Sequence, residues 1–183
     1  MNGKSEVFFD IETTGLDPFN SHLISIQIRI SEETIIWKEW EEGEEKIIKH
    51  FLDFTDSIYR KETRFIGYNI LKFDIPFITQ RMRNLSILNE NTWTTLYRSL
   101  SWFDLYQFLG DWYGRFKDWS LGLSGTSSDT VNKQIPDLYS KKEYMTIVTY
   151  INTEMTNMER VYESMQKQEF FKELQALRRK VLG

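Results

Sequence analysis

A short apolar run that ends in acidic residues is the feature that most constrains how this chain can fold. Val7, Phe8 and Phe9 are consecutive, and Asp10 and Glu12 come directly after them. Because successive side chains in this run are all apolar, it predicts a strand that is buried on both faces. Side chains alternate along a strand, so residues 10 and 12 share a face and their carboxylates can point at one spot.

Two neighbouring carboxylates need a cation between them, since their repulsion otherwise forces one of them to bind a proton. Their hard oxygen ligands favour Mg²⁺ or Mn²⁺. The pair also has a simpler interpretation. Thr13, Gly15 and Pro18 follow it, and acidic residues are common where a strand turns into solvent. The pair alone is compatible with either interpretation.

A third acid stands at the start of a predicted helix. The segment Arg64 to Gly67 suggests a strand that runs into a loop, and the helix is expected over residues 74–84. Pro76 is tolerated in a first helical turn, and Asp74 suits a helix N-terminus. Taken by itself, Asp74 is explained more simply as an N-cap than as part of a site.

The fourth acid lies in a long helix predicted to begin after Ser140, where Ser140 and Glu143 have the spacing of a capping box. An apolar stripe is expected on one side of this helix, with polar residues opposite. The stripe comprises Tyr144, Ile147, Val148, Ile151, Met155, Met158, Tyr162 and Met165, and the polar side comprises Asn152, Glu159, Arg160 and Glu163. Glu154 falls inside the stripe, so it must be protonated, paired with a cation or bound to metal, unless it reaches solvent at the stripe's edge. Tyr150 lies one turn before it, on the same surface.

Three segments of the chain, FFDIETTGLDP, GYNILKFDIPFI and YINTE, resemble the exonuclease motifs of the DnaQ-like DEDD superfamily, in the same order. The chain is similar to the proofreading domains of family B DNA polymerases and to stand-alone predicted exonucleases. In the tyrosine subclass of this family the third motif is Tyr followed four residues later by Asp, and here Tyr150 is followed by Glu154. A rival match, Tyr139 with Glu143, ranks second because the capping box already explains Glu143.

The resemblance implies a 3′-to-5′ exonuclease that acts on single-stranded DNA or RNA with two divalent cations, Mg²⁺ or Mn²⁺. It implies that Asp10, Glu12, Asp74 and Glu154 bind the metal and that Tyr150 aligns the attacking water. It also implies that Thr13, Gly15, Leu16, Asn69 and Phe73 contact the substrate strand. Two alternatives remain open. One is a catalytically weakened nuclease fold that binds nucleic acid or assembles a replication or repair complex, and the other is a structure-specific endonuclease with the same metal site.

The order of predicted elements agrees with an α/β fold of the ribonuclease H-like type, which the resemblance implies. Residues 22–30 alternate isoleucines with Ser25, Gln27 and Arg29, which predicts a half-buried strand. Residues 34–40 are expected to pair with it. A helix over residues 44–54, a strand near Phe65 and an apolar segment over residues 101–109 complete a mixed sheet, three antiparallel strands plus parallel strands, flanked by helices. We expect one exonuclease domain over residues 1–183, with a peripheral C-terminal helix at 166–183.

Composition excludes several other classes of protein. The chain of 183 residues has no cysteine and only two histidines, which argues against disulfides, thiolate zinc sites and histidine-rich metal sites. No apolar run is long enough to span a membrane, so we expect a soluble cytoplasmic protein. The net charge of −4 argues against a protein that coats nucleic acid. Local cations that can meet phosphates are Lys72, Arg81, Arg83, Arg115 and Lys117.

The stretch between Leu109 and Ile135 is rich in aromatic residues and is expected to be irregular. Its aromatic side chains, with Arg115 and Lys117 among them, can stack on unpaired bases, although a small hydrophobic cluster beneath a loop is the simpler interpretation. Asp104 and Asp111 are further candidates for the cleft, because the resemblance implies a strand-borne Asp near this point, but neither is predicted to bind metal.

Overall fold

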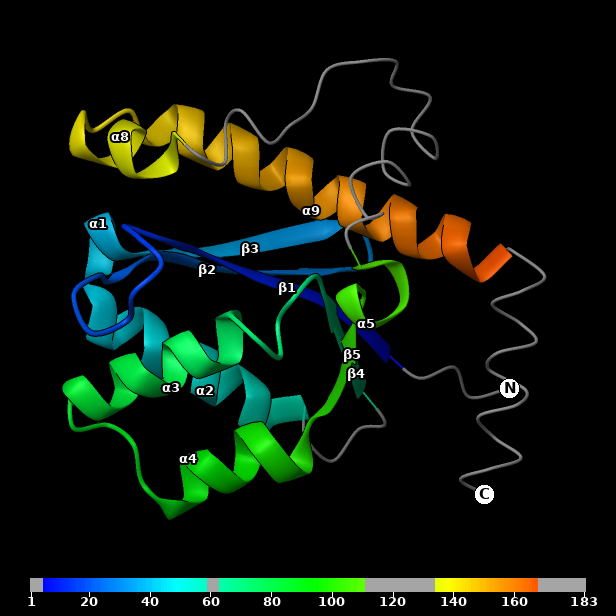
Figure 1. Ribbon diagram of the computed structural model, residues 1–183, viewed down its shortest axis with the longest axis horizontal. Helices are drawn as coiled ribbons and strands as arrows, with labels where there is room; N and C mark the ends of the chain where they lie inside the picture. Colours follow the sequence, from blue (N-terminus) through cyan, green and yellow to red (C-terminus); the bar gives the residue numbers. More distant parts are fainter. Residues whose placement is uncertain (1–4, 59–62, 111–133, 168–183) are drawn as a thin grey trace.

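Five strands form one mixed sheet in the order β3-β2-β1-β4-β5 (Figure 1). The computed structural model describes residues 5–58, 63–110 and 134–167. β1 (Ser5–Thr13), β2 (Leu23–Ile30) and β3 (Glu33–Lys38) are antiparallel neighbours, whereas β4 (Thr63–Gly67) and β5 (Ser101–Asp104) run parallel to β1. The predicted fold class is therefore confirmed.

Helices cover both faces of the sheet. The long helix α9 (Tyr144–Lys167) and α8 (Ile135–Ser140) lie on one face, while α2 (Glu44–Ile58), α3 (Asp74–Asn84) and α4 (Glu90–Thr94) lie on the other (Figure 1). Short helices are α1 (Glu39–Glu42), α5 (Tyr106–Leu109) and the π-helix η1 (Thr95–Ser99). No helix in the described parts of the chain is long and apolar enough to cross a membrane.

The sheet separates two hydrophobic cores, which we call the α2 core and the α9 core. Val7, Phe9 and Ile11 of β1 lie in the α2 core, whereas Phe8 lies in the α9 core. Because side chains alternate along β1, Asp10 and Glu12 share the face of Phe8 and lie toward α9. The apolar run of β1 thus anchors the strand in both cores, and its two acids project to one side.

The expectation that β2 is half-buried was wrong. Ser25 and Gln27 are fully buried, because α9 covers the face of the sheet on which they lie. The pairing of β1 with β2 shifts after Glu12, where Glu12 is opposite Ser25 and Thr13 is opposite Leu23. This irregularity leaves Ile24 without a direct partner and moves it into the α9 core. The alternating isoleucines of β2, which predict a single apolar face, are therefore divided between the two faces of the sheet.

Two details of the predicted long helix were also wrong. It begins at Tyr144, not directly after Ser140, and Ser140 is the last residue of the separate helix α8. The Ser140 hydroxyl donates to the carbonyl of Asp137, so it forms no capping box with Glu143. Glu159, expected on the polar side, forms an ion pair with Arg29 of β2 at 2.7 Å. A charged partner on the sheet explains why a glutamate occupies that position.

Two predicted features lie outside the described residues. They are most of the aromatic stretch, including Asp111, Arg115 and Lys117, and most of the C-terminal helix predicted over residues 166–183. The single-domain organisation over residues 1–183 therefore stays a prediction.

Candidate active site

The four acids predicted from the sequence come from three elements that surround the end of β1. Asp10 and Glu12 lie near the end of β1, on the face of the strand that points toward α9. Asp74 is the first residue of α3, and Glu154 lies on α9. Glu12 and Asp74 are buried, with 6% and 2% of their surfaces exposed, and Asp10 and Glu154 are partly buried. Carboxylates at such depth require protons, cations or hydrogen-bond donors.

Sheet geometry explains how Asp74 comes next to β1. β4 ends at Gly67, and the last residue of β1 in register with it is Phe8, so β1 runs on beyond its neighbour. The backbone of Gly67 lies very close to that of β1, since a Cβ on Gly67 would be 2.5 Å from the carbonyl oxygen of Phe9. The start of α3 lies beside the part of β1 that extends past β4, where Asp10 and Ile11 are found.

Capping does not explain Asp74. The N-cap of α3 is Phe73, and Asp74 itself is already helical. Oδ1 of Asp74 is buried and has no hydrogen-bond partner. The alternative of an N-cap was therefore wrong, and a buried carboxylate oxygen without a partner calls for another explanation.

The acids are close enough to change one another's protonation. Burial raises the pKa of Asp10 to about 7; the hydrogen bond from Gln27 opposes this rise, and the negative charge of Glu154 adds to it. Burial also raises the pKa of Glu12 well above its usual value, together with the charges of Asp10, Asp74 and Glu154. Burial and the charge of Asp10 do the same for Asp74. The carboxyl groups therefore hold protons more tightly than ordinary acids do, unless a cation neutralises them.

The donor atoms fit a hard divalent cation, although they are not gathered into a ready-made cage. All four side chains offer carboxylate oxygens, and the unpartnered Oδ1 of Asp74 is free to accept a ligand. Among residues 5–58, 63–110 and 134–167, however, no three His, Asp or Glu side chains are arranged so that they could hold a metal ion as they stand. Binding would require the carboxylates to draw closer than their mutual repulsion favours without an ion.

Tyr150 lies on α9 one turn before Glu154 and packs partly against the α9 core. The rival tyrosine, Tyr139, is engaged elsewhere, because its hydroxyl donates to Glu39. Its partner in that rival motif, Glu143, is exposed and lies outside α9. Glu154, by contrast, acts on the pKa values of Asp10 and Glu12. The geometry therefore favours Tyr150 and Glu154 over the rival pair.

The loop after β1 is tightly held and presents an exposed leucine. The Thr13 hydroxyl donates to the carbonyl of Gly15 at 2.7 Å, and Thr14 and His22 exchange hydrogen bonds across the loop. A Cβ on Gly15 would lie 2.6 Å from the Ser21 hydroxyl, so only glycine fits there without a shift. Leu16 is 83% exposed.

Arg81 anchors this loop instead of remaining available for phosphates. Its Nε and Nη2 donate to Glu44 at 2.8 and 2.7 Å, and its Nη1 donates to the carbonyl of Pro18. Both side chains of the ion pair are largely buried, at 14% and 11% exposed. The suggestion from the sequence that Arg81 meets phosphates is not supported, because its donors are occupied.

The other two predicted substrate contacts lie in the turn before α3. Asn69 has a left-handed backbone conformation, with φ of 62°, and its N–H donates to Asp104 at 2.7 Å. Asp104 also accepts from the N–H groups of Leu71 and Tyr106, so this buried acid organises the turn. Phe73 packs partly against the α2 core, with its ring 5.5 Å from that of Phe77.

Sequence reasoning missed Gln27. Its Nε2 donates to Oδ2 of Asp10 at 2.9 Å, and the two residues are direct partners in the pairing of β1 with β2. The available signal was a glutamine among isoleucines, which looked like the solvent side of a half-buried strand. Only the register of the two strands reveals its contact.

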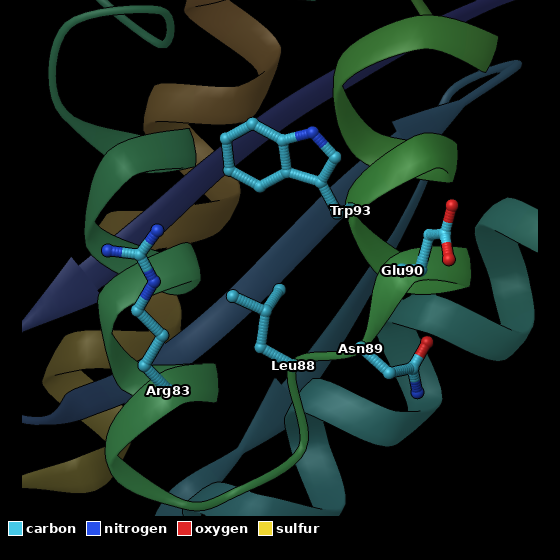
Figure 2. Close-up of a pocket in the computed structure, with 5 residues that line it drawn as sticks. All are labelled: Arg83, Leu88, Asn89, Glu90 and Trp93. Carbon is cyan, nitrogen blue, oxygen red and sulfur yellow. The ribbon is translucent and has the colours of Figure 1, made fainter.

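A separate hollow of about 410 Å³ lies between the end of α3 and the start of α4. Figure 2 shows Arg83 and Trp93 on opposite sides of it, with Leu88 between them. Asn89 and Glu90 complete the lining, so none of the predicted site residues takes part. This hollow is distinct from the cluster of acids.

Comparisons with known proteins bear on the family and the fold of the chain. Residues 7–166 match the family model described as the RNase H superfamily. The family B DNA polymerase from the hyperthermophilic archaeon Pyrobaculum calidifontis is similar in structure, with a TM-score of 0.69 and 14% identity over 90% of this chain. E. coli exonuclease I in complex with a 5cy-dA13 oligonucleotide gives a TM-score of 0.43 and 15% identity over 67% of this chain.

These similarities concern parts of larger proteins. The chain spans 25% of the polymerase chain and 31% of the exonuclease I chain. At such low identity the polymerase shows a shared fold, and the exonuclease I similarity is too weak to add to that. A search among curated protein sequences found no match.

Proposed function

Because the chain belongs to the RNase H superfamily, we propose that it is a metal-dependent 3′-to-5′ exonuclease that hydrolyses phosphodiester bonds in single-stranded DNA or RNA. The observation that carries this proposal is the proximity of Asp10, Glu12, Asp74 and Glu154 at the end of β1, where burial and neighbouring negative charges raise the pKa values of Asp10, Glu12 and Asp74. A protein gains nothing in stability from four acids placed this way, so their presence favours a role in binding a cation.

The ligands of divalent ions, Mg²⁺ or Mn²⁺, would be the four carboxylates of Asp10, Glu12, Asp74 and Glu154. When bound, divalent ions at such a site lower the pKa of a water molecule and stabilise the charge on the leaving oxygen. Support for this assignment comes from the unpartnered Oδ1 of Asp74. Burial around the acids also excludes bulk water, which strengthens the interaction of a carboxylate with a cation.

The remaining residues would bind and orient the substrate. Tyr150, one turn from Glu154 on α9, would orient the attacking water through its hydroxyl. Leu16, exposed on a loop held by the hydrogen bond between Thr13 and Gly15, would contact the last bases of a nucleic-acid strand. Asn69, fixed by Asp104, would contact the backbone of that strand. Phe73 would contribute only the part of its ring that the α2 core leaves uncovered.

A binding or assembly module without catalysis is the second candidate, and one observation favours it. Among the residues that the structure describes, the acids are not gathered into a group of three that could hold a metal. If they cannot close on an ion, the fold would keep its shape without hydrolysing phosphodiester bonds.

A degradation assay separates these candidates. Single-stranded DNA and RNA oligonucleotides labelled at the 3′ or the 5′ end are incubated with the protein in Mg²⁺, Mn²⁺ or chelator. The exonuclease proposal expects metal-dependent shortening from the 3′ end that Asp10→Ala reduces by at least about 1,000-fold.

Other results would decide differently. Cleavage of oligonucleotides with blocked 3′ ends would favour the structure-specific endonuclease. An absence of cleavage by folded wild-type protein in all conditions would contradict the exonuclease proposal and favour the binding module.

A further inference from the structure

Two polar side chains of β2 are buried beside the acids and require an explanation. Gln27 and Ser25 are each 0% exposed and lie on the face of the sheet that α9 covers. In the register of β1 and β2, Gln27 is opposite Asp10 and Ser25 is opposite Glu12. Burying an amide and a hydroxyl under a helix destabilises a fold unless their polar atoms find partners, and apolar residues would fill the same positions more simply.

The hydrogen bonds of these two residues run in one direction and end on Asp10. The Ser25 hydroxyl donates to Oε1 of Gln27 at 2.9 Å, and Nε2 of Gln27 donates to Oδ2 of Asp10 at 2.9 Å. An ionised carboxylate can only accept, and the carbonyl end of an amide can only accept as well. The orientation of the Gln27 amide is therefore fixed from both ends, by a donor on one side and an acceptor on the other.

This arrangement restricts the orientation of the Asp10 carboxyl group. With Oδ2 held by Gln27, rotation of the carboxyl group is limited, and the lone pairs not used by that bond stay in a defined direction. A buried hydroxyl whose hydrogen bond stays within its own helix makes no such contact. Thr55, also 0% exposed, donates within its own helix to the carbonyl of Leu52 and contacts no predicted ligand.

We propose that Gln27, held by Ser25, is a positioning residue that orients the Asp10 carboxylate for binding a divalent cation. This inference rests on the proposed metal-dependent function and names the groups that prepare its central ligand. Groups that orient a metal ligand from behind typically change metal affinity by about 10- to 100-fold when they are removed.

The test measures the affinity for Mn²⁺ by isothermal titration calorimetry, without nucleic acid, for wild type, Gln27→Met, Ser25→Ala and the double variant. We expect Gln27→Met to weaken Mn²⁺ binding by about 10- to 100-fold. Ser25→Ala, which leaves the amide but removes its anchor, should weaken binding by roughly threefold to tenfold, and it should have no further effect in the Gln27→Met background. Thr55→Val is the matched control and should bind Mn²⁺ as wild type does.

Denaturation by urea in chelator shows whether each variant is folded. If Gln27→Met does not fold, the proposal is tested with Ser25→Ala, since this variant keeps Gln27 and removes only the Ser25 hydroxyl that donates to it. Wild-type affinity in both single variants, or effects that simply add in the double variant, would overturn the proposal. A wild-type protein that binds no Mn²⁺ would instead overturn the metal site itself, and with it this inference, so the two failures are distinguishable.

Discussion

At the scale of single residues, Glu154 is the position where we expect the length of a side chain to affect turnover. It is partly buried on α9, and its charge reaches Asp10 and Glu12. We predict that Glu154→Asp lowers the turnover of a single-stranded oligonucleotide by about 10- to 100-fold, because α9 is placed for the longer side chain and a displacement of about 1 Å is costly to a reaction. Glu154→Gln, which keeps the length but removes the charge, should lower turnover by at least about 100-fold.

Glu163 provides the control for this prediction, since it is an exposed glutamate on the same helix. Glu163→Gln should leave turnover unchanged. Steady-state rates with labelled DNA or RNA in Mn²⁺ measure all three variants. Higher turnover in Glu154→Asp than in wild type would mean that α9 is placed for the shorter acid, contrary to this prediction.

The proximity of the acids was easier to predict from the sequence than the contacts of the groups around them. Asp10 and Glu12 follow from the alternation of a strand, and Glu154 follows from a carboxylate within an apolar stripe, because both patterns are local. Gln27 could not be predicted in this way. Its contact with Asp10 depends on the register of two strands joined by a loop, and a shift of one residue would have turned Gln27 to the other face of the sheet.

At the scale of elements, one ion pair ties α9 to the sheet. Nε of Arg29 on β2 donates to Oε2 of Glu159 at 2.7 Å, and the two side chains are 11% and 17% exposed. Breaking a pair at this depth leaves one charge poorly solvated. We therefore predict that Arg29→Met lowers the free energy of unfolding by about 2 kcal/mol and also lowers turnover, because Glu154 lies on the same helix.

An exposed ion pair on α2 offers the comparison. Lys49 and Glu45 are each 56% exposed, so Lys49→Met should change stability by no more than about 0.5 kcal/mol. Urea denaturation followed by circular dichroism measures both variants. If Arg29→Met were as stable as Lys49→Met, the pair would not anchor α9.

The start of a helix was predictable where the sequence contains a residue that a helix tolerates only in its first turn. The predicted span of α3 agrees with Asp74–Asn84, since Pro76 fits only a first turn. The start of α9 was not predicted correctly, because Ser140 and Glu143 imitate a capping box while Ser140 in fact closes α8. The burial of β2 was misjudged for a different reason, which is that covering by α9 is a tertiary effect.

At the scale of the whole molecule, the cluster of acids links stability to pH. The pKa of Asp10 rises from 3.8 to about 7 on folding, chiefly because the group is buried. Between these two values the folded protein holds a proton that the unfolded protein has released. The contribution of Asp10 to stability in chelator therefore falls as pH rises from about 4 to about 7 and then levels off, since at this group the unfolded chain binds fewer protons than the folded one in that interval.

Asp10→Asn removes this group without changing its shape, and it also relieves Glu12 and Asp74 of a neighbouring charge. In chelator at pH 8 we predict that Asp10→Asn is more stable than wild type by about 1 to 2 kcal/mol, and that the difference disappears near pH 4. Mn²⁺ should reverse the order, because only wild type keeps the full set of ligands. Urea denaturation at pH 4 and pH 8, with Asp53→Asn as an exposed control, measures these differences. A wild type that is more stable than Asp10→Asn in chelator at pH 8 would mean that hydrogen bonds, above all that from Gln27, outweigh burial and repulsion at Asp10.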